Sequence, residues 1–222
     1  MSTTTQVEGV LYFIPVEANI AVTTSRAEIR QQIRRQRQQL SEAQRHQATL
    51  AISANLAQTP IFRQSRRIAG FIANDGEPSL EPLMQLAWAR RKQWHLPIIG
   101  LPNINHLWFG RYDAGDALTL NRYGIPEPDI ALHQTTPTWG LDLVLMPLVA
   151  FDAQGNRLGM GKGYYDRTLK FLRHRCHWRK PRLIGIAYEF QQMEQLPHQS
   201  WDIPLDAIVT EQSVYNVSRI KL

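Results

Sequence analysis

The sequence predicts an α/β protein of one domain, in which a mostly parallel sheet is covered by helices. Short apolar segments that are typical of strands alternate along the chain with segments of helical periodicity. One of them, LDLVLMPLVAF at 141–151, is almost continuously apolar, as a strand buried on both faces should be. The 222 residues, 43% of them hydrophobic, suffice for one full core. These observations favour a Rossmann-like three-layer fold.

Two helices are expected at the start of the domain. Ser25 can cap the first, and SEAQ at 41–44 has the Ser-x-x-Gln form of a capping box that opens the second, which ends before Pro60. Residues 1–24 are interpreted as an N-terminal extension, flexible or packed on an edge, and residues 25–222 as the domain itself.

Strands and helices then alternate. RIAGFIA at 67–73 is an expected strand, and LEPLMQLAWARRK at 80–92 is a helix with Leu80, Leu83, Met84 and Ala87 on one face. Next come the strands QWHLPII at 93–99 and HLWFGRY at 106–112, and a stretch rich in Pro and Gly through NRYGIPEPDI, expected as ordered loop. After 141–151, the spacing from Tyr165 to Leu169 and Leu172 is helical, and strands return at 181–188 and 206–211.

Composition narrows the function classes. A net charge of +6 favours acidic partners, which could be nucleic acid, a membrane surface or a polyanionic small molecule. The basic residues form clusters, and those at 63–67, 89–92 and 173–182 are expected to be solvated faces. The single cysteine, Cys176, rules out an internal disulfide framework, which predicts a reducing compartment and a cytoplasmic location. No apolar run approaches membrane-spanning length.

The segment RLGMGKGYYDR at 157–167 holds the main functional signal. Glycines alternate at 159, 161 and 163, between a buried strand and a helix start, where free backbone N–H groups and the helix dipole favour anions. It matches neither the Walker loop, because no Ser or Thr follows Gly161-Lys162, nor the spacing of the dinucleotide fingerprint. A tight turn with a surface lysine is the alternative. Phosphate binding is favoured because Arg157, Lys162 and Asp166 share the turn.

The order and spacing of several segments resemble the 5-formyltetrahydrofolate cyclo-ligase family, also called 5,10-methenyltetrahydrofolate synthetase. The resemblance covers about residues 25–211 and is carried by LDLVLMPLVAFDAQGNRLGMGKGYYDRTL together with RAEIR, GEPSLEPLM, LPII, YGIPEPD, LIGIAYEFQ and WDIPLDAIVTE. It implies an enzyme that converts 5-formyltetrahydrofolate, possibly polyglutamylated, into 5,10-methenyltetrahydrofolate, consuming ATP with magnesium and releasing ADP and phosphate. It also implies a monomer with neither a nucleic-acid nor a membrane partner.

The implied reaction explains the residue types. The formyl oxygen is a poor leaving group, so ATP is expected to phosphorylate it before nitrogen 10 closes the ring. Phosphoryl transfer of this kind depends mainly on positioning and charge stabilisation, which calls for backbone donors, fixed cations and magnesium.

By resemblance, the ATP phosphates contact one arginine pair and the glycine segment, namely Arg26, Arg30, Arg157, Leu158, Gly159, Met160, Gly161, Lys162, Gly163, Tyr164 and Tyr165. Arg157, Lys162 and Tyr164 are the implied catalytic residues. The family shows Lys-x-x-x-Arg at 26–30 and a basic residue at position 160, where this chain has two arginines and Met160. One helical turn separates Arg26 from Arg30, so both can reach one ligand.

The resemblance also implies a metal and a folate site. Asp166 and Asp202 are the expected magnesium ligands, with Asp206 as a competitor for the second. Glu77, Met160 and Tyr164 are expected to contact the folate, with Glu77 accepting two N–H bonds from the aminopyrimidine edge. For Glu77 the alternative is an acid at a helix N-terminus. The aromatic residues of LWFGRY and RYGIPEP are expected mostly in the core, although some could line the pocket.

Two other functions fit parts of the sequence. A nucleic-acid-binding module could use the basic helices and the Gly-Lys-Gly loop, and its binding would fall steeply with salt. A small-molecule kinase of unrelated lineage could use the same loop. An assay for the methenyl product separates these functions from ring closure.

Overall fold

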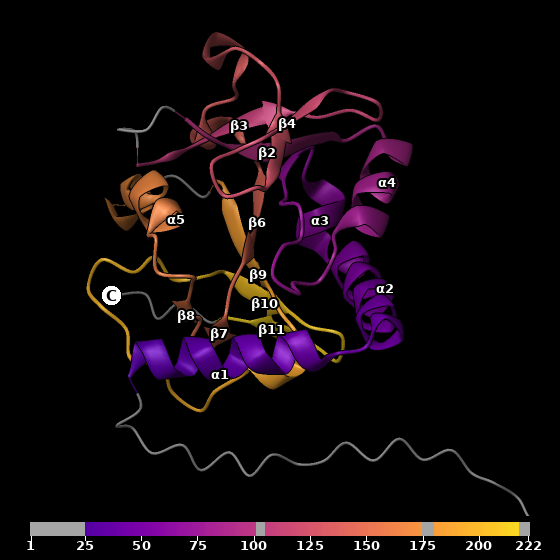
Figure 1. Cartoon of the computed structure of the whole chain (residues 1–222). Helices are drawn as coiled ribbons and strands as arrows, with labels where there is room; N and C mark the ends of the chain where they lie inside the picture. Colours follow the sequence, from indigo (N-terminus) through magenta and orange to yellow (C-terminus); the bar gives the residue numbers. More distant parts are fainter. Residues whose placement is uncertain (1–24, 101–104, 175–179, 218–222) are drawn as a thin grey trace, which may run out of the picture.

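The computed structural model describes residues 25–100, 105–174 and 180–217 (Figure 1). Cys176 therefore lies outside the described residues. The helices are α1 (Arg26–Gln39), α2 (Glu42–Gln58), α3 (Pro60–Gln64), α4 (Glu81–Ala89) and α5 (Tyr164–Thr168), with 3-10 turns at Leu132–Gln134, Thr138–Gly140, Lys170–His174 and Glu189–Gln191. None of the helices in these ranges is both long and apolar enough to cross a bilayer.

A seven-stranded sheet forms the centre of the domain. Its order is β11 (Val214–Asn216), β10 (Ala207–Val209), β9 (Arg182–Ile186), β6 (Leu143–Pro147), β1 (Arg67–Ala69), β2 (Gln93–Ile99) and β3 (Leu107–Arg111). The five inner strands are parallel, and the two edge strands are antiparallel to their neighbours. Two small hairpins stand apart, β4 (Leu118–Leu120) with β5 (Pro126–Pro128), and β7 (Ala150–Phe151) with β8 (Arg157–Leu158). The predicted, mostly parallel α/β fold is confirmed.

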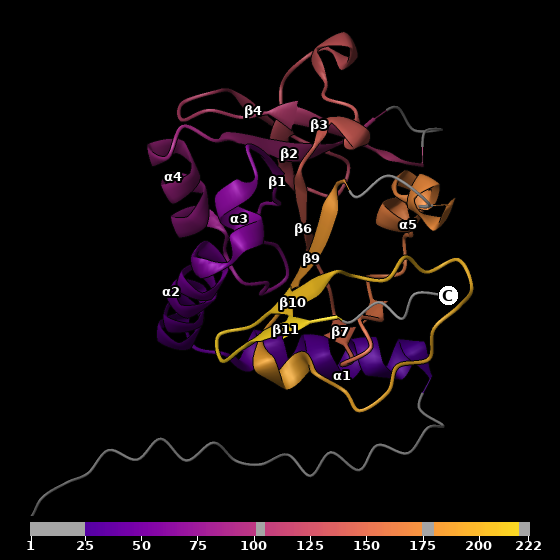
Figure 2. The same ribbon diagram turned by 180° about the vertical axis from the view of Figure 1, so that it is seen from behind.

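Helices cover both faces of the sheet (Figures 1 and 2). On one face, α2, α3 and α4 bury apolar side chains against the strands around Trp94 and Leu145. On the other, Leu169 and Leu172, at and after the end of α5, pack on the strands around Val144 and Ile208. Helix α1 lies against the β7–β8 hairpin instead, where Ile29 is buried with its neighbours. This placement brings the arginines of α1 to the glycine segment.

The first two helices begin where the sequence predicts. The Ser25 hydroxyl accepts from the Glu28 N–H at 3.3 Å, while the Glu28 carboxylate accepts from the Ser25 N–H at 2.8 Å. Ser41 and Gln44 form the same reciprocal pair at the start of α2. Both capping boxes satisfy backbone donors that the helix itself leaves open, which fixes the two starts.

Three expectations about strands need correction. The strand expected at 67–73 ends at Ala69, and the next residue, Gly70, packs so closely that an added Cβ would lie 2.1 Å from the Trp94 ring. The segment 141–151 is not one strand, because the chain leaves the sheet after Pro147 and pairs again as β7. The stretch expected as loop contains the β4–β5 hairpin, and β11 adds an edge strand that was not predicted.

Candidate active site

The glycine segment forms an open turn between β8 and α5. Gly161 and Gly163 have φ of 93° and 67°, in the left-handed region that side chains disfavour, and Gly163 precedes the first residue of α5. Within the described part of the chain, the N–H groups from Gly159 to Gly163 donate to no acceptor. A run of unbonded backbone donors on an exposed turn is suited to binding an anion.

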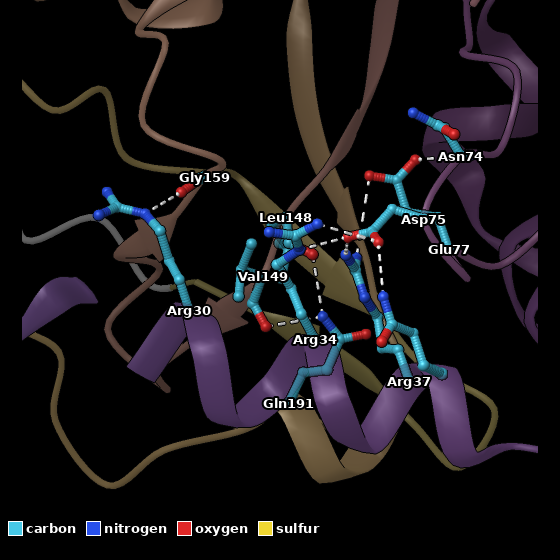
Figure 3. Close-up of polar contacts among 11 residues, drawn as sticks. Arg30, Arg34, Arg37, Asn74, Asp75, Glu77, Leu148, Val149, Gly159 and Gln191 are labelled. Atoms are coloured by element: carbon cyan, nitrogen blue, oxygen red, sulfur yellow. Dashed lines mark hydrogen bonds and ion pairs between the residues drawn. The ribbon is translucent and has the colours of Figure 1, made fainter. Parts of the chain in front are cut away.

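Two arginines of α1 reach this turn. The Arg30 Nε donates to the Gly159 carbonyl at 2.8 Å (Figure 3). The Arg30 guanidinium also lies beside Gly161, 3.4 Å from where a Cβ would stand. Arg26 pairs with Asp202 at 3.3 Å. Burial lowers the pKa of Arg30, and the nearby charge of Arg26 lowers it further. Because the two positive charges repel each other, an anion bound between them would stabilise both.

Arg157 lies beneath the turn, with its side chain 5% exposed. Its Nη2 donates to Asp166 Oδ1 at 2.6 Å, and its Nη1 donates to the Ile203 carbonyl. By resemblance, Arg157 was expected to contact the ATP phosphates. In the structure, both of its terminal nitrogens already donate to protein acceptors. Leu158 is likewise buried, against the Ile29 side of α1, so only its backbone is available to a ligand.

Asp166 lies beside the backbone that follows Asp202. The Ile203 N–H donates to Asp166 Oδ1 at 3.3 Å, and Asp202 is the preceding residue. Asp166 accepts both of its hydrogen bonds, from Arg157 and the Ile203 N–H, on Oδ1. Asp202 accepts both of its hydrogen bonds, from Arg26 and the Gln199 N–H, on Oδ2. Among described residues, each carboxylate thus keeps one oxygen without a hydrogen bond.

This pair fits magnesium, which usually takes one or two carboxylates and completes its shell with phosphate and water oxygens. No group of three or more His, Cys, Asp or Glu that could hold a metal by itself occurs in the described ranges. Asp206 is a poorer ligand, because its side chain is 3% exposed and both oxygens are engaged, Oδ2 by the Leu183 N–H and Oδ1 near Arg182.

Tyr164 and Lys162 lie close to Tyr123 of the RYGIPEP segment. Tyr164 accepts a hydrogen bond from Arg122, and its hydroxyl lies 3.1 Å from that of Tyr123. Tyr123 is 42% exposed, and the Lys162 Nζ lies 5.9 Å from its ring centroid. Tyr123 is therefore one of the aromatic residues that could line the pocket and does not belong to the core. Its place next to Gly124, in a turn between two strands, was the available signal.

Lys162 has no carboxylate partner among the described residues, and its backbone carbonyl is held by Arg167 Nη2 at 2.6 Å. The turn therefore presents, from a fixed backbone, an ammonium group that lies near the Tyr123 ring and pairs with no described carboxylate. Met160, on the same turn, is 45% exposed and makes no polar contact with the rest of the site.

Glu77 lies on the loop that follows β1, and its side chain is 11% exposed. One oxygen accepts from the Asn74 N–H at 3.1 Å, and the other lies 3.8 Å from Arg37 Nη1 (Figure 3). Burial raises the pKa of Glu77 to about 7, against the lowering effects of Arg37 and the Asn74 N–H. The helix-terminus interpretation is wrong, because α4 begins at Glu81 and has no side-chain cap.

Tyr165 connects this loop with the glycine segment. Burial raises the pKa of its hydroxyl, the charge of Glu77 raises it further, and Arg157 opposes both. Tyr165 is therefore within electrostatic reach of residues from both loops.

A cavity of about 830 Å³ is lined in part by Arg167. Trp108 lines it together with Trp139 and Phe171, whose rings meet edge to face at 6.5 Å. Of the LWFGRY aromatics, Phe109 is buried in the core as expected, while Tyr112 packs on Trp88 at 5.8 Å.

Comparison with known proteins gives one consistent result. Residues 22–211 match the model of the 5-formyltetrahydrofolate cyclo-ligase family. The chain is 38% identical to the 5-formyltetrahydrofolate cyclo-ligase of Haemophilus influenzae, over 82% of this chain and 96% of that protein. It is 35% identical to that of Escherichia coli K12, over 82% and 98% respectively.

Solved structures agree. The 5,10-methenyltetrahydrofolate synthetase of Aquifex aeolicus superposes with a TM-score of 0.74 at 33% identity, covering 89% of this chain and 95% of that one. The Mycoplasma pneumoniae protein described as a 5,10-methenyltetrahydrofolate synthetase superposes with a TM-score of 0.66 at 24% identity, over 85% and 99%, which supports the shared fold.

Proposed function

The chain belongs to the 5-formyltetrahydrofolate cyclo-ligase family, and we propose that it closes the ring of 5-formyltetrahydrofolate by an ATP- and magnesium-dependent phosphorylation of the formyl oxygen. The observation that carries this proposal is the turn at 159–163. Among the described residues its N–H groups donate to no acceptor and the ammonium of Lys162 pairs with no carboxylate. Asp166, which follows the turn, and Asp202 each keep one carboxylate oxygen without a hydrogen bond in the same part of the chain.

The proposed phosphate site combines backbone and side-chain donors. The N–H groups of the turn, Lys162 and the α1 pair of Arg26 and Arg30 would hold the triphosphate. Arg157 would act from below by holding Asp166 and the Ile203 carbonyl in place. This arrangement supplies fixed positive charge where negative charge is redistributed during transfer, without a protein nucleophile.

Asp166 and Asp202 would hold magnesium through the oxygen that each keeps open. When bound, the metal neutralises phosphate charge. The side chains contribute by orientation, because the Arg157 and Arg26 pairings fix which carboxylate oxygen faces the site.

The proposed chemistry has two steps. The terminal phosphoryl group of ATP moves to the formyl oxygen as its bond to the ADP oxygen breaks. Nitrogen 10 then attacks the formyl carbon and loses its proton, and the bond between carbon and the phosphorylated oxygen breaks, which gives the methenyl bridge and free phosphate. Glu77 would orient the pterin by accepting two N–H bonds, and Tyr164, with Met160 nearby, would contact the folate beside Lys162.

The absorbance of the methenyl product tests the proposed function. We expect product only when 5-formyltetrahydrofolate, ATP and magnesium are present together, because the formyl oxygen cannot leave unless it is phosphorylated. ADP release from ATP without methenyl product would favour a kinase, and salt-sensitive binding of nucleic acid without turnover would favour a nucleic-acid module.

Replacing the metal carboxylates should alter the magnesium requirement. Asp166→Asn and Asp202→Asn each remove a hard anionic ligand, so both should raise the magnesium concentration for half-maximal activity more than they raise the folate KM. Asp206→Asn is the control, because Asp206 is buried and engaged by backbone and Arg182. A magnesium titration that shifts for Asp206→Asn but not for Asp202→Asn would reverse the assignment of the second ligand.

A further inference from the structure

Helix α1 contacts both halves of the proposed site. Near its start, Arg30 holds the glycine turn through the Gly159 carbonyl. Near its end, three side chains converge on Asp75 (Figure 3): Arg34 donates at 2.6 and 3.2 Å, Arg37 at 2.7 Å and Gln38 at 3.2 Å. The same helix therefore fixes the phosphate turn and the loop that carries Glu77.

The backbone at Asp75 depends on these contacts. Its φ of 51° lies in the left-handed region, which is uncommon for a residue other than glycine. The next residue, Gly76, approaches α1 so closely that an added Cβ would lie 3.3 Å from the Arg37 carbonyl. The arginines, with Arg34 contributing most, hold the pKa of Asp75 below its ordinary range, so the Asp75 carboxylate stays ionised at neutral pH.

Arg37 is the most unusual member of this group. Its side chain is fully buried, and only its Nη2 has a hydrogen-bond acceptor, on Asp75. Its Nε and Nη1 have no hydrogen-bond partner among the described residues, and Nη1 is the atom 3.8 Å from Glu77. A buried guanidinium with open donors is costly, and an apolar side chain of similar volume would often be at least as stable. Stability alone is therefore a poor explanation for this arginine.

We propose that Arg37, held in place by Asp75, is a positioning residue that favours the ionised form of Glu77 and orients it to bind the pterin. This inference rests on the proposed function, because it takes Glu77 as the pterin acceptor. An ionised carboxylate can accept two N–H bonds from the aminopyrimidine edge, whereas a protonated one turns one oxygen into a donor. The state of Glu77 thus decides folate affinity.

The charges around Glu77 favour this role for Arg37. Among the described side chains, the charged or titratable groups that act on Glu77 or are affected by its charge are Arg37, Asp75, Tyr165 and Tyr188. The two tyrosines are neutral near pH 7, because burial raises both of their pKa values, that of Tyr188 to about 12. Asp75 repels the ionised form of Glu77, so Arg37 is the one cation among these groups that stabilises it. Without it, burial and Asp75 act unopposed except for the Asn74 N–H.

Arg37→Gln tests the inference, with Arg37→Lys as the charge-conserving variant and Arg35→Gln as a matched control. Arg35 is on the same helix, exposed, and has no ion pair with any described residue. At pH 7, Arg37→Gln should raise the folate KM about tenfold or more and leave the ATP KM within about twofold. In a pH profile from pH 6 to pH 9, the acid limb of kcat/KM for folate in Arg37→Gln should shift to higher pH by about one pH unit.

The outcomes separate positioning from packing. Arg37→Lys should keep the acid limb near that of the natural protein, and Arg35→Gln should change neither constant. An unshifted limb and an unchanged folate KM in Arg37→Gln, whatever its melting temperature, would overturn the inference. If Arg37→Gln does not fold, Arg34→Gln replaces it: Arg34 is 43% exposed and donates twice to Asp75, so its loss should raise the folate KM severalfold. If the folate KM of Arg34→Gln equals that of the natural protein, the inference is overturned as well.

The same measurements distinguish this inference from the proposed function. If the natural protein forms no methenyl product, the proposed function fails before any variant is compared. If the natural protein is active and the Arg37 and Arg34 variants bind folate normally, only the role of Arg37 is wrong.

Discussion

Lys162→Ala should lower turnover by about a hundredfold or more, the cost typical of removing one preorganised group that stabilises charge in a transition state. Lys162 lies in the turn whose N–H groups have no described acceptor, and its ammonium has no carboxylate partner among described residues. Its charge is therefore available to the phosphoryl group. The loss should appear in kcat as well as in kcat/KM, because the charge of that group is redistributed during transfer.

Lys170→Ala is the matched control for this effect. Lys170 follows α5, is exposed and makes no ion pair with a described residue, so its loss should leave turnover unchanged. Near-natural turnover in Lys162→Ala would mean that the glycine turn is structural and that the phosphates bind elsewhere.

Glu77→Gln should raise the folate KM by about ten- to a hundredfold and leave the ATP KM nearly unchanged. A buried charged acceptor that loses its charge typically costs about 1.5 to 3 kcal/mol of binding free energy, and the folate KM follows if it tracks binding. The glycine turn, which would hold ATP, has no hydrogen bond or ion pair to Glu77. Both constants can be measured on one preparation.

The same variant should gain stability at alkaline pH. The folded pKa of Glu77, about 7, lies above its ordinary value of 4.5. Between these values the folded state holds a proton that the unfolded state has lost, so the free energy of unfolding falls as pH rises through this window. At pH 8 the free energy of unfolding of Glu77→Gln should therefore exceed that of the natural protein by up to about 3 kcal/mol, seen as a higher melting temperature. This difference should disappear by pH 5. A lowered melting temperature with unaltered folate KM would remove Glu77 from the site.

Features set by neighbouring residues could be predicted from the sequence. The starts of α1 and α2 follow from capping pairs three residues apart, at Ser25 and Ser41. The inner strands follow from apolar runs that need burial on both faces. The glycine turn is a local feature as well, since its positive φ angles at Gly161 and Gly163 call for the residue type found there.

Features that depend on distant contacts were not predictable in the same way. Asp75 meets Arg37 across 38 positions of sequence, so neither residue signals the other. The buried state of Arg157 depends on Ile203, 46 positions away, and the raised pKa of Glu77 depends on burial that periodicity does not report. Tyr123 is 42% exposed in the turn of the β4–β5 hairpin, whose strand pairing was not evident from a segment rich in Pro and Gly.

The fate of the formyl oxygen tests the central claim most directly. The natural protein would be given 5-formyltetrahydrofolate carrying 18O in the formyl group, with unlabelled ATP and magnesium, and the released phosphate analysed by mass spectrometry. If ATP phosphorylates the formyl oxygen, each phosphate released with a methenyl product carries one 18O. Unlabelled phosphate, with the label appearing in water, would contradict phosphorylation of that oxygen and the site built around it.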